Sequence, residues 1–301
     1  MTMELGTQTL PREVWTARAE RHRERAQARL QRVIERRQRG EKHPVWDFLF
    51  EYYRLRPADL IAWSPGIGVR LLQGDEFVGR RFFTVDEDGA ASVDAEAVLA
   101  KRGQTLDFTR RLMAAVDGRP ARFGCFGMHE WAMVHRASAN AVRHAVPLRF
   151  SVEETARIVE QTGLRCSHFD AFRFFTPEAA PLNQTQLTRD DQLDSDQGGC
   201  LHVNMDLYKW VGKLHPLTSS ELLFDCYELA CEIRELDMRA SAYDLADWGF
   251  SPVKVETTQG RTEYVRLQRR HAERAVMLRQ RFMDELDAIQ SRRIDTIRGT
   301  K

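Results

Sequence analysis

One candidate site combines an acid and a histidine with several aromatic side chains. His168 and Asp170 lie among four phenylalanines in the segment 168–175. We expect 164–172 to be extended, which places His168 and Asp170 on the same face of a strand. A carboxyl held among rings loses water, and its pKa rises, so Asp170 is the first candidate for a general base, acting with His168. The alternative is a buried hydrogen-bonded pair that only braces the loop after Pro177.

A second candidate site contains a His-Glu pair at His129 and Glu130, followed by Trp131. The zinc metalloprotease motif needs another histidine four residues after the first, and Met133 occupies that position. The Glu-x-x-His spacing of di-iron proteins does not occur within the candidate sites either. We therefore expect no metal and no cofactor. Glu130 is the second candidate for a catalytic carboxylate, and His129 and Trp131 are candidates for substrate binding.

Two further segments carry polar side chains on predicted helices. In 200–210, helical spacing puts His202, Asp206 and Lys209 on one stripe, which fits either a ligand site or a solvated face. In 228–244, charged residues crowd the end of an apolar helix, as in a ligand site or an ion-pair network. The candidate substrate-binding residues of these two segments are His202, Asn204, Asp206, Tyr208, Lys209, Arg234, Glu235, Asp237 and Arg239.

The elements that must position these residues are predicted to be mostly helical. Capping boxes at 151–154 and 218–221 each begin a helix, and helical periodicity marks both ends of the chain. Alternating apolar residues and turns between 68 and 93 indicate short strands, and 253–257 is also strand-like. The polar segment 178–199 is expected to be a mobile loop that closes over a bound ligand.

We predict a mainly α fold with a minor β element (α+β), forming a single large globular domain. Its predicted parts are a basic N-terminal helix, a core domain that carries the candidate site, and a basic C-terminal helix that packs on the core. These parts comprise residues 1–42, 43–260 and 261–301.

Charge is distributed unevenly along the 301 residues, although the net charge is only +1. Residues 12–42 hold 11 Lys and Arg against 5 Asp and Glu, and residues 261–301 hold 11 against 6, which leaves the centre acidic. Basic ends suit either a polyanionic partner such as DNA or merely solvated helix faces. The candidates for contact with the DNA backbone are Arg32, Arg36, Arg37 and Arg39.

Other features of the composition narrow the class of protein. No stretch is apolar enough for a membrane span, so no membrane partner is expected. The five cysteines form no C-x-x-C pair, which favours reduced thiols and a cytoplasmic location. The composition excludes disordered, collagen-like and disulfide-stapled classes.

Several strings of the chain, spread from His43 to about Arg270, resemble a bacterial family commonly described as 3-methyladenine DNA glycosylase. The resemblance assigns no catalytic residue. The strings that carry it are His43-Pro44 with Phe48-Leu49-Phe50, and the segments 128–133, 168–175, 202–210 and 234–241.

The resemblance implies a DNA glycosylase that excises a modified or damaged base. Such an enzyme flips a nucleotide out of the duplex and uses a carboxylate to activate water or stabilise the oxocarbenium ion. The base is expected to be an alkylated purine or a bulky modified pyrimidine of phage DNA, the latter implying antiviral defence. The alternatives are a metal- or small-molecule-dependent enzyme that uses the same side chains and a non-catalytic nucleic-acid-binding protein.

Overall fold

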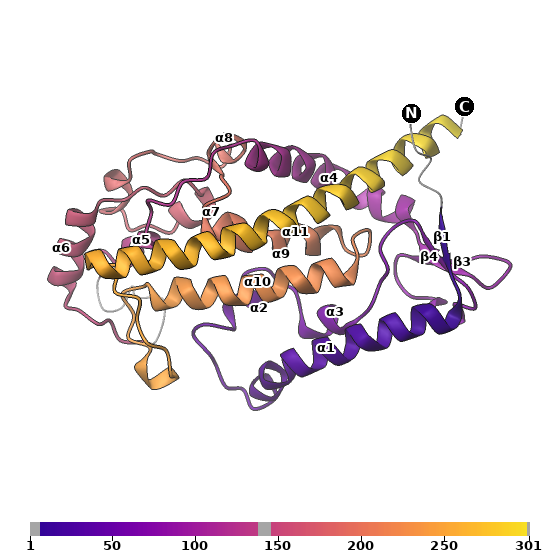
Figure 1. Cartoon of the computed structure of the whole chain (residues 1–301), viewed down its shortest axis with the longest axis horizontal. Coiled ribbons are helices and arrows are strands. Elements are labelled where there is room, and N and C mark those ends of the chain that lie inside the picture. The colour runs from indigo at the N-terminus through magenta and orange to yellow at the C-terminus, as the bar shows by residue number, and fades with distance from the viewer. Residues whose placement is uncertain (1–6, 138–145, 300–301) are drawn as a thin grey trace.

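The computed structural model describes residues 7–137 and 146–299. It is built mainly from helices, with a small four-stranded sheet at one end (Figure 1). The helices share one large hydrophobic core, and a smaller cluster of buried side chains lies beside the sheet. The predicted mainly α fold with a minor β element in one domain is therefore confirmed.

Four helices form the centre of the molecule, and α10 packs against both α9 and α11. Nearly every residue of α9 is buried, because other helices surround it. The cap of α10 is Ser219, whose hydroxyl accepts a hydrogen bond from the Leu222 amide, one residue later than the predicted capping box begins. These four helices are α4 (Ala95–Asp117), α9 (Leu201–Leu214), α10 (Ser220–Arg239) and α11 (Thr258–Gly299).

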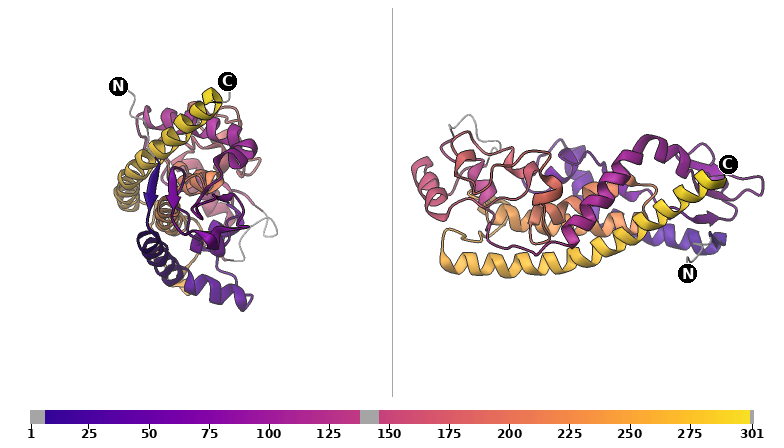
Figure 2. Two further views of the ribbon diagram at one scale, coloured as in Figure 1. Left: turned by 90° about the vertical axis from the view of Figure 1, so that its right-hand side faces the viewer. Right: turned by 90° about the horizontal axis from the view of Figure 1, so that it is seen from above.

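The C-terminal helix α11 runs along most of the molecule, as two views at right angles show (Figures 1 and 2). It packs against α10, α9 and α4. Its buried side chains include Tyr264, Phe282 and Ile289, while its arginines lie mostly toward the surface. This helix begins three residues before the start of the predicted C-terminal segment, 261–301.

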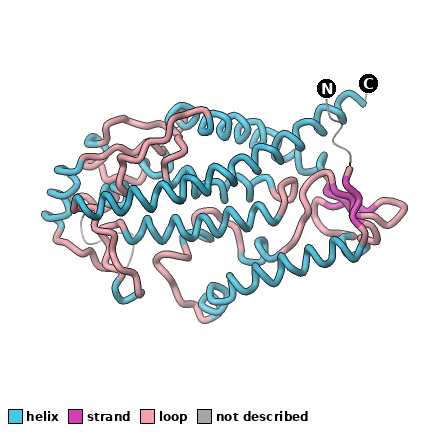
Figure 3. Tube along the Cα trace, in the orientation of Figure 1, coloured by secondary structure: helices cyan, strands magenta, loops and turns pink. Residues whose placement is uncertain are grey.

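The N-terminal helix α1 supports the sheet. Its apolar stripe is buried as predicted, and Trp15 stacks on Trp63 beneath the strands. The strand order is β1-β2-β4-β3, with β1 parallel to β2 and the other pairs antiparallel (Figure 3). These elements are β1 (Gln8–Leu10), α1 (Arg12–Gln38), β2 (Val69–Leu71), the 3-10 helix Asp75–Phe77, β3 (Phe83–Val85) and β4 (Ala91–Val93).

Short helices joined by loops make up most of the remaining chain and carry much of the candidate site. Their backbone polar groups bond locally or to neighbouring loops, as at Leu164, which pairs with Asn183 in an isolated bridge. These elements are α2 (Phe48–Glu51), α3 (Pro57–Ile61), α5 (Met128–Ala132), α6 (Val152–Thr162), α7 (Phe169–Phe172), α8 (Gln192–Ser195) and the 3-10 helices Ala180–Leu182 and Ala246–Trp248.

Three predicted elements differ from the structure. The expected strand 164–172 ends in the helix α7, because the amides of Ala171 and Phe172 bond to the carbonyl of His168. The segment 178–199 contains two short helices and buries Asn183, so it is not a structureless loop. The predicted strand 253–257 has no ladder partner and turns directly into α11.

Within the described residues, every helix is either too short or too polar to span a membrane.

Candidate functional site

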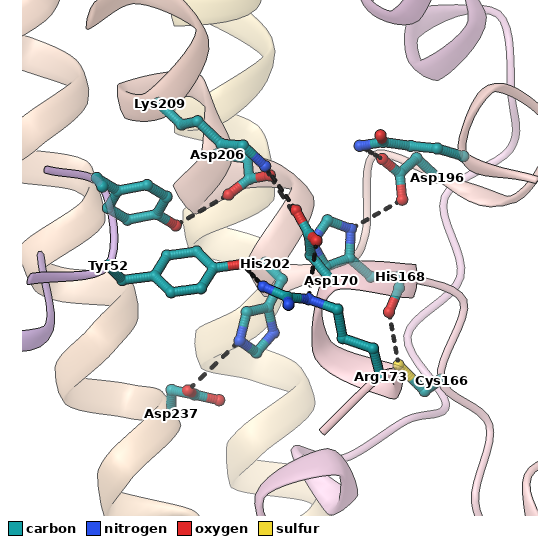
Figure 4. Close-up of polar contacts among 12 residues, drawn as sticks. Tyr52, Cys166, His168, Asp170, Arg173, Asp196, His202, Asp206, Lys209 and Asp237 are labelled. Atoms are coloured by element: carbon teal, nitrogen blue, oxygen red, sulfur yellow. Dashed lines mark hydrogen bonds and ion pairs between the residues drawn. The ribbon is translucent and has the colours of Figure 1, made fainter. Parts of the chain in front are cut away.

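Lys209 joins two carboxylates that are far apart in the sequence. Its Nζ lies 2.7 Å from Asp170 Oδ2 on α7 and 2.8 Å from Asp206 Oδ2 on α9 (Figure 4). Burial alone lowers the pKa of Lys209, but the two anions more than compensate and raise it. Of the predicted stripe on α9, His202 and Asp206 line one cavity and Lys209 lines the adjoining one.

Asp170 is ionised rather than a strong base. Burial raises the pKa of its carboxyl, as expected from the aromatic neighbours, but the positive charges of Lys209 and Arg173 outweigh burial and lower the pKa overall. Arg173 Nε lies 3.1 Å from Asp170 Oδ1. The prediction of a raised pKa is therefore wrong, because it did not include the cation that α9 supplies.

His168 is braced by a second acid. Its Nδ1 lies 2.9 Å from Asp196 Oδ1, and its Nε2 lies 3.8 Å from Asp206 Oδ2. Although burial lowers the pKa of His168, these two carboxylates raise it above the usual value. Asp206 is fixed further by the hydroxyl of Tyr53, which donates to Oδ1 at 2.9 Å. The pair predicted between His168 and Asp170 is replaced by one between His168 and Asp196.

A second network of buried polar side chains is centred on Arg234 and Asp237. Arg234 Nη1 is 2.8 Å from Glu130 Oε1 and 2.9 Å from Asp237 Oδ2, and His129 Nε2 is 2.6 Å from Asp237 Oδ1. Burial raises the pKa of Glu130, which Arg234 opposes without cancelling. Burial also disfavours the Asp237 anion, but His129 and Arg234 hold its pKa far below the usual range. Four predicted candidates from two separate segments, His129, Glu130, Arg234 and Asp237, thus form one network.

His202 lies between the two networks and is nearly buried, with 8% of its surface exposed. Its ring is 4.3 Å from the ring of His129 and 5.7 Å from that of His168, measured between centroids. The nearest acid is Asp237, whose Oδ2 is 3.9 Å from His202 Nε2, and the ring makes no hydrogen bond to any described residue. Burial, followed by the positive charge of His129, lowers the pKa of His202 well below its usual value. The neutral imidazole is therefore available to accept a hydrogen bond or to bind a ligand.

Two adjoining cavities open around Asp170. The smaller, of about 180 Å³, is lined by three aromatic rings and by side chains of both networks. The larger, of about 450 Å³, is lined by five cations together with four aromatic residues. Tyr52 and Asp170 line both, so the two cavities meet at these residues. The aromatic residues of the smaller cavity are Phe48, Tyr52 and Phe174, and the cations of the larger are Arg54, Arg173, Arg189, Lys209 and Lys213.

A third cavity, of about 580 Å³, lies on the other side of the histidines. His202 lines both this cavity and the aromatic one, while His129 lines this one alone. The remaining walls are mixed: Arg122, Arg165 and the thiol of Cys125 lie among apolar residues such as Leu164 and Leu182.

Six predicted substrate-binding residues lie outside these cavities. Asp237 belongs to the second network, and packing explains the other five. The Trp131 indole donates to the carbonyl of Ala240, and Tyr208 is fully buried among aromatic rings. Asn204 turns away to donate to the carbonyl of Gly198. Glu235 pairs with Arg239, whose guanidinium also donates to the carbonyl of Ser251, so neither reaches a cavity.

The structure adds residues that sequence reasoning did not select. Tyr52 and Phe174 form walls of the aromatic cavity, and Asp196 fixes His168. Arg54 and Arg189 line the cationic cavity. The aromatic run 48–53 was visible in the sequence, but its spacing predicts only burial. No local pattern links the separate cations.

Three of the four N-terminal arginines proposed to contact DNA interact with their own chain. Arg36 lies 3.5 Å from Asp47, Arg37 stacks over the ring of Phe50, and Arg39 pairs with the exposed Glu41. Arg32 is exposed. These contacts reduce the positive charge that the segment offers to a polyanion.

Two groups of side chains bring metal-ligating atoms within 4.8 Å of one another. In the second group, Lys209 already lies between the two carboxylates, so a cation would compete with the ammonium. In the first group, Arg234 donates to one oxygen of the Asp237 carboxylate, Oδ2, from one side of the group. The first group is His129, His202 and Asp237, and the second is His168, Asp170 and Asp206.

Comparisons with protein-family models, with curated proteins and with solved structures found no match to this chain. The candidate site therefore rests on the geometry of the chain itself.

Proposed function

We propose that this protein is a DNA glycosylase that hydrolyses the N-glycosidic bond of a modified or damaged base. The observation that carries the proposal is the meeting of an aromatic cavity and a cationic cavity at Asp170 and Tyr52. A flipped nucleotide needs this combination, because its base is flat and apolar on its faces while its phosphates are anionic.

The aromatic cavity is suited to hold the base. Its volume of about 180 Å³ equals that of about six water molecules in the liquid. This is enough for the ring system of one base. Phe48, Tyr52 and Phe174 offer faces or edges for stacking, and His202 offers an unpaired ring nitrogen to the base edge. A base that carries a large substituent needs further room, which the 580 Å³ cavity beyond His202 contains.

The cationic cavity is suited to hold the flanking phosphates. Arg54, Arg189 and Lys213 line it from three separate segments, and in the described structure none of the three forms a salt bridge with an acid. Arg173 and Lys209 lie deeper, where they are paired with Asp170. The outer cations are thus available to a polyanion, and the inner ones hold the acid in place.

Asp170 is the proposed catalytic carboxylate. Ion pairing keeps it ionised, and it lies at the junction where the sugar of a nucleotide would bridge its base and its phosphate. An anion there stabilises positive charge on the sugar as the glycosidic bond breaks, and orients the attacking water. His168 and Asp206 act as positioning residues that fix Lys209 and the wall around it. Glu130 is another carboxyl of the cavity, with a pKa raised by burial.

The test is base release from duplex and single-stranded DNA that carries one modified base in each substrate. Substrates with an alkylated purine and with a bulky modified pyrimidine are incubated with the full chain. Abasic sites are then cleaved with alkali, and the released base is identified by mass spectrometry. Release by the wild type and its loss in Asp170→Asn are expected. Tight DNA binding without release from any substrate would replace the proposal with a non-catalytic nucleic-acid-binding protein.

A second candidate function is a metal- or small-molecule-dependent enzyme, favoured by the first group of potential metal ligands beside the 580 Å³ cavity. The two candidates differ in the ligand of the cationic cavity. A glycosylase binds DNA through several phosphates and shows a steep salt dependence, whereas a small polar metabolite releases few counterions.

A further inference from the structure

The second network contains a ligand set that its internal hydrogen bonds do not complete. His129 on α5, His202 on α9 and Asp237 on α10 converge from three helices, and all three side chains are buried. Two of them are already paired, because His129 Nε2 lies 2.6 Å from Asp237 Oδ1. His202 is the exception, since its ring is nine-tenths buried and has no hydrogen-bond partner among the described residues.

The ring of His202 lines two cavities, so a ligand can reach the ring nitrogens, which the described residues leave without a hydrogen bond. Its Nε2 points toward Asp237 Oδ2 from 3.9 Å, too far for a hydrogen bond but close enough to share an ion (Figure 4). Tetrahedral coordination at bond lengths near 2.0 Å separates ligand atoms by about 3.3 Å. One ligand atom from each of the three side chains lies within 4.8 Å of the other two, so shifts of up to about 1.5 Å would bring these atoms to that spacing.

We propose that His129, His202 and Asp237 bind one divalent transition-metal ion of the zinc or iron class. Two imidazoles and one carboxylate suit these ions better than magnesium or calcium, which prefer sets of oxygen ligands. Binding displaces the proton shared by His129 and Asp237, and the ion takes its place.

The side chains around the three ligands are chemically similar to those that contact the ligands of known metal sites. Arg234 donates to Asp237 Oδ2 at 2.9 Å. Such contacts orient ligands and set their donor strength. Glu130 balances the charge of Arg234, so Asp237 alone offers a net negative charge to the ion.

The same geometry provides an entry path and an open position. His129 and His202 both line the 580 Å³ cavity, together with polar side chains that include Arg122 and Gln197. An ion held by three protein atoms has at least one coordination position left for water or a ligand in that cavity. The second group, around Lys209, is the internal comparison, because its carboxylates already have an ammonium partner.

The experiment is a Zn²⁺ titration of chelator-treated full-length protein in competition with a chromophoric chelator. Wild type is expected to bind one equivalent. His202→Ala is expected to weaken binding at least 10-fold, because removing even an outer-shell partner of a ligand commonly costs 10- to 100-fold. Asp206→Asn, in the second group, is the matched control and should bind as wild type does. Since His202 makes no hydrogen bond, its removal should leave the fold intact, which circular dichroism checks.

A second measurement does not depend on any variant. Co²⁺ added to the wild-type protein should give the visible absorption of a tetrahedral nitrogen and oxygen site, and added Zn²⁺ should abolish it. Absence of one tightly held equivalent in the wild type would overturn the proposal. It would also be overturned if His202→Ala bound Zn²⁺ normally, or if Asp206→Asn lost the ion while His202→Ala kept it. Because the readout is metal binding, its failure leaves the proposed base excision untouched.

Discussion

Lys209 holds Asp170 at 2.7 Å across 39 positions of sequence, and this pair connects the long helix α9 to the short helix α7. The contact determines the protonation state of the proposed catalytic carboxylate. It also places that carboxylate where the aromatic and cationic cavities meet. The chemistry proposed for Asp170 therefore depends on Lys209, which need not contact the reacting bond.

Replacing Asp170 by asparagine is expected to lower base release by about 10²- to 10⁴-fold, because the variant cannot stabilise positive charge on the sugar or orient water. DNA binding should persist, since the cations of the larger cavity remain. Single-turnover rates on the preferred substrate provide the measurement. The control is Asp225→Asn, an ion-paired aspartate of similar exposure outside the cavities. Wild-type turnover in Asp170→Asn would show that the pair with Lys209 is only structural.

Replacing Lys209 by glutamine is expected to change the pH dependence of base release. Lys209 and Arg173 lower the pKa of Asp170, so in the wild type the active anion persists as the pH falls below the usual aspartate range. Without the ammonium, burial dominates and raises the pKa of Asp170, so activity should be lost at a higher pH as the solution is acidified. Rates from pH 4 to 8 test this. An acid limb at the same pH in both proteins would assign that limb to another group.

The sequence predicts helix periodicity better than it predicts which polar groups meet. The stripe of α9 followed from spacing within one helix, and its members line two adjoining cavities. The environment of Asp170 could not be obtained in this way, because Lys209 reaches it only after α7 and α9 pack together. The prediction of an extended segment 164–172 was wrong for a similar reason, because hydrogen bonds to the His168 carbonyl override the alternating pattern.

The same limit explains the overpredicted binding residues. Trp131 and Tyr208 belong to segments rich in chemistry, yet both are fully buried and make packing contacts. Asn204 comes two residues after His202 on the same helix, so its side chain points to the other side of the helix. His129, His202 and Asp237 come from three helices without any shared spacing, so no motif could bring them together.

Neutralising the outer cations of the larger cavity should weaken binding to all DNA sequences alike. In Arg54→Gln/Arg189→Gln/Lys213→Gln, the slope of log affinity against log salt should fall by about two to three, since each phosphate contact contributes about 0.9. The matched set is Arg32, Arg36, Arg37 and Arg39 changed to glutamine, which should have a smaller effect because most of these arginines already have partners. An unchanged slope in the cavity set, with a large change in the N-terminal set, would move the phosphate contacts to α1.

Ligand binding should order only the middle of the segment 178–199. Its two ends are already fixed: Asn183 exchanges hydrogen bonds with the backbone of Cys166, and Gln197 Oε1 accepts from the amides of Arg122 and Gly199. Between them, Arg189 and Gln192 line the cationic cavity, so a bound phosphate would draw this stretch inward.

Hydrogen exchange with and without DNA that carries the preferred base provides the measurement. Peptides covering 186–192 should gain protection when DNA binds, because a closed segment excludes water from the charges beneath it. Peptides at the anchored ends, and the helix α6 as an external control, should exchange equally in both states. If 186–192 is equally protected with and without DNA, the segment is a fixed wall of the cavity. A gain spread over all of 178–199 would instead mean that the anchors at Asn183 and Gln197 open in the free protein.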